Sequence, residues 1–89
     1  MTMPPEPRET RLKRLSMRSM RRGIKEMDII LSRFASERLA AMSDTHLDLY
    51  EDLLDENDQD IYQWVSGQAA PPAELTGLIE EIRRMVGAS

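Results

Sequence analysis

The segment LTGLIEEIRRMV, residues 75–86, decides the fold class of this chain. Its apolar residues recur every three or four positions, at Leu75, Leu78, Ile79, Ile82 and Val86. This spacing gives an α-helix one continuous apolar face. Arg83 and Arg84 lie in its last turns, where cations oppose the negative end of the helix dipole, and Gly87 follows as a typical helix end. The segment therefore predicts a final helix that packs through one face against a core.

The same period extends upstream and predicts four more helices. They are expected to run from a cap at Glu9 or Thr10 to about Met20, from Ile24 to about Leu39, and from Asp44 after a cap at Ser43 to about Asp55. A short fourth helix follows a cap at Asn57 or Asp58, carries Ile61, Trp64 and Val65, and has Gly67 at its C′ position. No run alternates apolar and polar residues as a strand does. The predicted fold class is all-α, a compact bundle of about five short helices. We expect residues 1–9 to be a disordered, Pro-rich tail and residues 10–87 to be a single helical domain.

Charge divides the 89-residue chain into a basic and an acidic half. Residues 1–38 hold ten Lys/Arg and five Asp/Glu, whereas residues 39–89 hold two Lys/Arg and eleven Asp/Glu. The basic half leaves open a small helical nucleic-acid-binding or antitoxin-type regulator, because clustered cations neutralise phosphates. No aromatic residue is interleaved for base stacking, and the acidic half would repel a polyanion. A basic face that docks an acidic protein partner is the other interpretation.

Residue types that carry catalysis or bind metals are scarce. The chain has no cysteine and one histidine, His46, which excludes disulfides, Cys-ligated zinc and a Cys-His catalytic pair. The acidic run at residues 55–60 is similar to a calcium-binding loop. However, Asp60 stands where that loop needs glycine, and Ser66 stands where it needs its closing glutamate. We therefore predict no catalytic residue and no metal site, and we interpret His46 as a surface or capping residue.

One glycine, Gly23, separates two helical stretches within Arg22-Gly23-Ile24-Lys25-Glu26. Glycine suits a positive φ or close approach by another backbone. Glu26 falls in the first turn of the next helix, where an acid is favourable. An exposed Arg22–Glu26 pair, four residues apart, would contribute about 0.2–0.5 kcal/mol. The stretch is either a plain corner between helices or a preformed surface knob that a partner binds.

Two blocks of the sequence together resemble the SdhE-type FAD assembly factors, the succinate dehydrogenase assembly factors of bacteria and mitochondria. The first is Arg-Gly-x-x-Glu at residues 22–26, extended to Met20 and Asp28. The second is Leu53-Leu54 followed by Asp58-x-Asp60-Ile61-x-x-Trp64. The resemblance covers roughly residues 10 to 86. Trp64 and the leucine pair lie on helical stripes, so we interpret them as core residues.

The resemblance implies a chaperone-like assembly factor that is not an enzyme. Such a factor binds the immature flavoprotein subunit of succinate dehydrogenase, and in some bacteria that of fumarate reductase, and promotes covalent FAD attachment. It implies no stably bound cofactor and no nucleic-acid partner, and we expect a monomer when free. The implied partner-binding residues are Arg21, Arg22, Gly23, Glu26 and Asp28. The basic half of the chain is then interpreted as the docking face for the flavoprotein.

The expected cellular location rests on two sequence features, a membrane-spanning helix and a signal peptide, neither of which the sequence predicts. No stretch reaches the roughly 20 apolar residues of a membrane-spanning helix. The opening residues 1–7 carry prolines at positions 4, 5 and 7, where a signal peptide has an apolar run. We expect a cytoplasmic protein that does not insert into membranes.

Overall fold

The helices follow one another in the order that the apolar pattern predicts. A computed structural model describes residues 6–87. It contains α1 (Arg8–Ser19), α2 (Lys25–Arg38), α3 (Asp44–Leu54), α4 (Asp58–Val65) and α5 (Thr76–Gly87), with 3-10 turns at Leu39–Ala41 and Ala73–Leu75. Within that range there is no strand. The all-α prediction, with five short helices, is confirmed.

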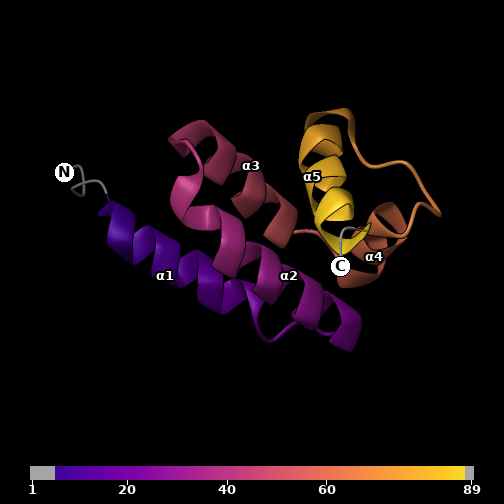
Figure 1. Ribbon diagram of the computed structural model, residues 1–89, viewed down its shortest axis with the longest axis horizontal. Helices are drawn as coiled ribbons and strands as arrows, with labels where there is room; N and C mark the ends of the chain where they lie inside the picture. Colours follow the sequence, from indigo (N-terminus) through magenta and orange to yellow (C-terminus); the bar gives the residue numbers. More distant parts are fainter. Residues whose placement is uncertain (1–5, 88–89) are drawn as a thin grey trace.

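The five helices form two groups that share one core (Figure 1). The long helices α1 and α2 lie side by side and run in opposite directions, and α3 packs beside them. The shorter α4 and the final helix α5 pack against each other and against α2. This arrangement brings the turn between α1 and α2 next to the start of α4, where an α4 side chain bonds to the turn.

Local signals determine where α3 begins and where α4 begins and ends. Ser43 Oγ accepts the backbone N–H of His46 at 3.1 Å, and Asn57 Oδ1 accepts that of Gln59 at 2.8 Å. Both bonds satisfy donors that a helix start leaves unpaired. Gly67 has a φ of 84° just after α4, a conformation that glycine adopts without the penalty other residues incur. These predicted caps are confirmed.

The first helix starts earlier than predicted. Its first bond runs from the N–H of Arg11 to the carbonyl of Pro7 at 3.0 Å, so the helix begins at Arg8. Proline lacks an N–H but its carbonyl accepts normally, which suits it to this position. Residues 8 and 9, expected in the tail, are thus helical, and Glu6 bonds to Arg14. The rest of the expected tail, residues 1–5, lies outside the described residues.

All five helices contribute to a single apolar core. Its buried members include Leu53 and Leu54 from α3 and Trp64 from α4, which confirms their interpretation as core residues. In α5 the structure buries Met85, three residues after Ile82, whereas Val86 in the last turn remains 39% exposed. At these apolar positions burial removes surface from water, the main favourable contribution to folding.

One polar contact lies inside this apolar core. The hydroxyl of Ser19, at the end of α1, lies 2.5 Å from the Tyr50 hydroxyl of α3, and both residues are fully buried. Ser19 Oγ also donates to the Leu15 carbonyl at 2.8 Å. Burial raises the pKa of Tyr50 to about 12, although the Ser19 hydrogen bond acts in the opposite direction. The contact therefore joins α1 to α3 through a neutral phenol.

Candidate functional site

The turn between α1 and α2, residues 20–24, is held by a single carboxylate. Asp58, in the first turn of α4, accepts the backbone N–H of Gly23 on Oδ2 at 2.5 Å. Its other oxygen, Oδ1, accepts Nε of Arg22 at 2.7 Å. Asp58 thus bonds to two consecutive residues of the Arg-Gly-x-x-Glu motif. We call residues 21–26 the motif corner.

Arg22 is directed into the protein. Its side chain is 10% exposed, and that of Asp58 is 16% exposed. Besides this ion pair, its guanidinium donates to the carbonyl of Leu54 at 3.1 Å and to that of Arg18 at 3.2 Å. Both carbonyls belong to the last turns of helices, where the dipole favours a cation. The predicted Arg22–Glu26 pair is not among the ion pairs of residues 6–87, because Arg22 is paired with Asp58 instead.

The structure favours glycine at position 23 for a different reason than the sequence suggested. Among residues 6–87, the positive φ belongs to Gly67 and not to Gly23. A Cβ at Gly23 would lie 3.2 Å from Asp58 Oδ2, which is tighter than ordinary van der Waals contact. The close approach comes from a carboxylate side chain, rather than from another backbone. Gly23 itself remains exposed at the surface.

The other predicted partner-binding residues present charge outward to different degrees. Arg21 and Glu26 are exposed, and neither makes an ion pair within the part of the chain that the structure describes. Asp28 is half-buried, and its Oδ1 accepts the Ser32 hydroxyl at 3.3 Å within α2. The corner thus exposes the cation Arg21, the backbone of Gly23 and the acid Glu26. The ion pair between Arg22 and Asp58 fixes the conformation of the turn.

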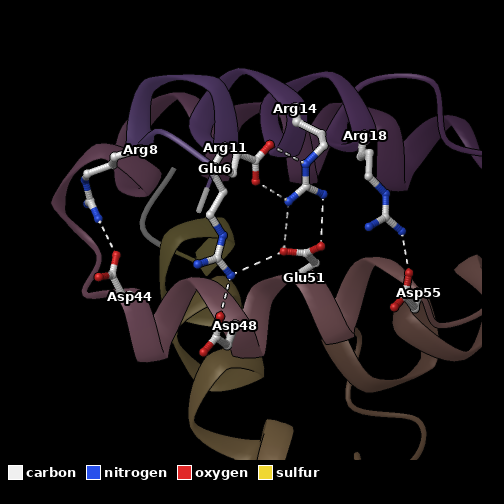
Figure 2. Close-up of polar contacts among 9 residues, drawn as sticks. All are labelled: Glu6, Arg8, Arg11, Arg14, Arg18, Asp44, Asp48, Glu51 and Asp55. Atoms are coloured by element: carbon white, nitrogen blue, oxygen red, sulfur yellow. Dashed lines mark hydrogen bonds and ion pairs between the residues drawn. The ribbon is translucent and has the colours of Figure 1, made fainter. Parts of the chain in front are cut away.

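The basic and acidic halves of the chain meet along α1 and α3 (Figure 2). Four arginines on one stripe of α1 face three acids on one stripe of α3 and Asp55, the residue that follows α3. The pairs are Arg8–Asp44, Arg11–Asp48, Arg11–Glu51, Arg14–Glu51 and Arg18–Asp55. Residues of each stripe are three or four positions apart, so they lie on one face of their helix. We call this set the α1–α3 ladder.

Glu51 is the centre of the ladder. It accepts hydrogen bonds from Arg11 and from Arg14, the latter at 2.9 Å. The hydrogen bond from Arg14 is the main cause that holds the pKa of Glu51 below its usual value, and burial opposes it. Glu6 has a lowered pKa for the same reason, since Arg14 also bonds to it. The same bonds raise the pKa of Arg14, so all three groups stay charged near neutral pH.

The ladder corrects the interpretation of the basic half as a docking face. The four arginines on this stripe are neutralised within the molecule by acids of the other half. Their phosphate-binding capacity, which motivated the nucleic-acid alternative, is correspondingly reduced. Among residues 6–87, the cations of the N-terminal half without an ion pair to a carboxylate in the ladder or elsewhere include Lys13, Arg21 and Lys25. Lys13, Arg21 and Lys25 thus place unpaired positive charge between the middle of α1 and the motif corner.

His46 joins two helices. Its Nε2 lies 2.8 Å from Glu81 Oε2, which connects α3 to α5. Residues 6–87 contain no group of three or more potential metal ligands. In that same range, no helix is long and apolar enough to cross a membrane. The contact between His46 and Glu81 lies on the opposite side of α3 from the ladder acids Asp48 and Glu51.

Two features of this region escaped sequence reasoning. Asp58 is interpreted there only as a helix cap or an acidic turn, and the ladder is read as two separate charge runs. A usable signal exists for the ladder, because cations in α1 and acids in α3 both recur at three- to four-residue spacing. For Asp58 the signal is weaker, because the sequence shows only that an acid stands in the second block of the resemblance.

Comparison with known proteins identifies relatives that match most of this chain. Residues 13–86 match the family model described as the flavinator of succinate dehydrogenase. Succinate dehydrogenase assembly factor 2, mitochondrial, of Meyerozyma guilliermondii is 52% identical over 61 residues, which are 68% of this chain and 45% of the relative. Assembly factor 2-B of Drosophila mojavensis is 42% identical over 84 residues, 92% of this chain and 54% of the relative. The chain spans about half the length of these two curated relatives.

Proposed function

The chain belongs to the family of flavinators of succinate dehydrogenase, and from this we propose that it binds the immature flavoprotein subunit of that enzyme and promotes covalent attachment of FAD. The observation that carries the proposal is the match to the family over residues 13–86, which contain the whole motif corner and Asp58. The fumarate reductase flavoprotein, which the family serves in some bacteria, is a second proposed client.

We assign the binding surface to the motif corner. Arg21 and Glu26 are the charges that it exposes, and the exposed Gly23 backbone lies between them. Arg22 contributes indirectly, because its ion pair with Asp58 fixes the turn. Asp28 borders the surface from the first turn of α2. A corner held in one conformation before binding loses less conformational entropy when the client docks.

The factor acts by arrangement rather than by donating a catalytic group. In the family, a client histidine becomes bonded to the 8α-methyl carbon of the flavin, and we propose that the client and its FAD supply this chemistry. Holding reacting groups in the right geometry lowers a barrier by several kcal/mol without an added acid or base. In support, His46 is engaged with Glu81 in the described structure. FAD is thus cargo of the client, and we propose that this chain does not hold it stably.

Deletion of the gene tests the function directly. We expect the succinate dehydrogenase flavoprotein of the deletion strain to lose most of its covalent flavin, seen as lost in-gel flavin fluorescence, and a plasmid copy to restore it. Normal fluorescence in the deletion strain under several growth conditions would overturn the proposal.

The binding surface has its own test with purified proteins. We expect Glu26→Lys to weaken binding to the flavoprotein by roughly tenfold or more, because charge reversal at an interface both removes a contact and adds repulsion. Glu74→Lys is the matched control, since Glu74 is also exposed in the first turn of a helical segment. Equal affinity of both variants and the unaltered chain would contradict the assignment of the corner.

The compartment and the oligomeric state remain predictions. The names of the relatives place them in mitochondria, and we propose that this chain acts wherever its client flavoprotein matures, which is the cytoplasm in a bacterium. We propose a monomer in the absence of the client, which sedimentation of the purified chain would test.

A further inference from the structure

Two methionines at the end of α1 are exposed to solvent. Met17 is 65% exposed and Met20 51% exposed, whereas Met27, Met42 and Met85 are 0%, 6% and 4% exposed. At this exposure, much of the apolar surface of both side chains contacts water, and burying that surface would be favourable. Scattered exposed apolar residues are normal in proteins. These two, however, line one pocket.

The pocket lies on the outer face of the last turns of α1. It has a volume of about 230 Å³ and is lined by Met17, Arg18, Met20 and Arg21. Methionine has a flexible, polarisable side chain, so such a pocket adapts to apolar groups of different shape. Met20 and Arg21 are continuous in sequence with Arg22 and Gly23. The pocket therefore adjoins the surface to which we assign client binding.

The charge around the pocket is positive. Lys13 precedes Met17 by four residues and thus lies on the same face of α1. Arg21 lines the pocket, is exposed, and makes no ion pair within residues 6–87. The guanidinium of Arg18 is paired with Asp55, in the ladder. A partner segment with one apolar side chain and a neighbouring carboxylate matches this combination in both polarity and charge.

We propose that this methionine pocket binds an apolar side chain of the client flavoprotein that is flanked by a carboxylate, and that Arg21 pairs with the carboxylate. The inference rests on the proposed function for the identity of the partner. It extends the binding surface from the corner, residues 21–26, back along α1 to Met17. In this arrangement the methionines supply contact area, and Arg21 joins the apolar and the polar parts of the surface.

Methionine oxidation tests the pocket without altering the sequence. The purified chain, alone and saturated with its purified flavoprotein subunit, is treated with dilute hydrogen peroxide, and the sulfoxide at each methionine is measured by mass spectrometry. In the free chain, Met17 and Met20 oxidise faster than the buried Met27, because peroxide reaches exposed thioethers first. We expect the complex to lose this difference. Unchanged oxidation of both residues in the complex would overturn the inference.

Matched variants give a second measurement. Met17→Gln with Met20→Gln keeps the side-chain length and the helix propensity but adds polar groups, and we expect it to weaken binding by roughly tenfold or more. Met17→Leu with Met20→Leu keeps the apolar surface and is expected to keep most of the affinity. Circular dichroism verifies that both variants are helical. Equal affinity of the glutamine and leucine variants would overturn the pocket as a binding site.

The outcomes separate the pocket from the proposed function. If the unaltered chain does not bind the flavoprotein, the proposed function and the pocket's occupant are both wrong. Suppose instead that the unaltered chain binds and that Glu26→Lys weakens binding. If the glutamine and leucine variants then bind equally well, and complex formation leaves the oxidation of Met17 and Met20 unchanged, only the pocket proposal is wrong.

Discussion

Asp58 and Arg22 form an ion pair that joins the start of α4 to the turn between α1 and α2, with Oδ1 of Asp58 2.7 Å from Nε and 2.6 Å from Nη2 of Arg22. Both side chains are largely buried. The remaining carboxylate oxygen accepts the Gly23 N–H. The corner is thus fixed by a structural unit of three residues, two from the motif and one that lies 35 positions beyond Gly23 in the chain.

Asp58→Ala should therefore destabilise the fold. The substitution leaves a largely buried guanidinium without its carboxylate, and such losses typically cost about 2–4 kcal/mol. For a chain of this size we expect the melting temperature to fall by roughly 10 °C or more, measured by circular dichroism. Asp60→Ala is the control, because Asp60 is exposed in the same turn of α4. A melting temperature for Asp58→Ala equal to that of the control would show that the pair contributes nothing.

Stability should depend on pH through the ladder residue Glu51 and through Glu6, which also pairs with Arg14. Their pKa values are lower in the folded chain than the usual 4.5. Their contribution is therefore complete above about pH 5 and is lost as the pH falls through the folded-state pKa values. We expect Glu51→Gln to lower the free energy of unfolding by about 1 kcal/mol near pH 7. In urea unfolding, this difference from the unaltered chain should shrink as the pH is lowered below 4.5 and through the folded-state pKa of Glu51.

Glu80→Gln is the control for this pH dependence, because Glu80 is exposed on α5, outside the ladder. Added salt provides an independent measurement, since exposed ion pairs are screened at high ionic strength. The difference between Glu51→Gln and the unaltered chain should shrink as sodium chloride is added. A difference that is constant in both pH and salt would mean that the ladder has no electrostatic role.

The buried Ser19–Tyr50 contact predicts non-additive substitutions. Ser19→Ala leaves the Tyr50 hydroxyl without its partner inside the core and should cost about 1–3 kcal/mol. Tyr50→Phe removes the hydroxyl itself and should cost about 1 kcal/mol, because Ser19 Oγ still donates to Leu15. The double variant should be more stable than the sum of the two single losses predicts. Urea unfolding of the four proteins measures this coupling, and strict additivity would contradict it.

Two glycines should respond to alanine with opposite signs. Gly77 lies within α5, and a Cβ placed there meets no atom within 4 Å. Gly77→Ala should therefore stabilise the chain by about 0.5–1 kcal/mol through helix propensity. Gly67 has a φ of 84°, so Gly67→Ala should destabilise it by about 1 kcal/mol. Thermal melts of the two variants should lie on opposite sides of the unaltered chain, and shifts in the same direction would contradict this.

The sequence predicts most of the fold because its strongest signals are local. The period of Leu75, Leu78, Ile79 and Ile82 requires only neighbouring turns of one helix, and all four residues are buried. Likewise, the caps at Ser43 and Asn57 bond within their own first turn. At the start of α1, prediction and structure differ by two or three residues, because the first helical bond joins the N–H of Arg11 to the Pro7 carbonyl.

The candidate site was less accessible to sequence reasoning because its partners are distant in the chain. A local rule pairs Arg22 with Glu26, four residues away. The structure pairs it with Asp58, because folding brings the start of α4 against the turn and offers a shielded carboxylate. The arginines of α1 likewise appear free in the sequence, yet α3 supplies an acid for each of the four on the ladder stripe.

The sequence by itself therefore determined the five helices, their apolar faces and the location of the motif, since these depend on spacing along the chain. Tertiary structure decided which charges remain available to a partner. Opposite charges far apart in sequence pair only after packing has brought them close together. That packing pairs Arg22 and the ladder arginines within the fold, and it leaves Arg21, Glu26 and the exposed Met17 and Met20 on the surface.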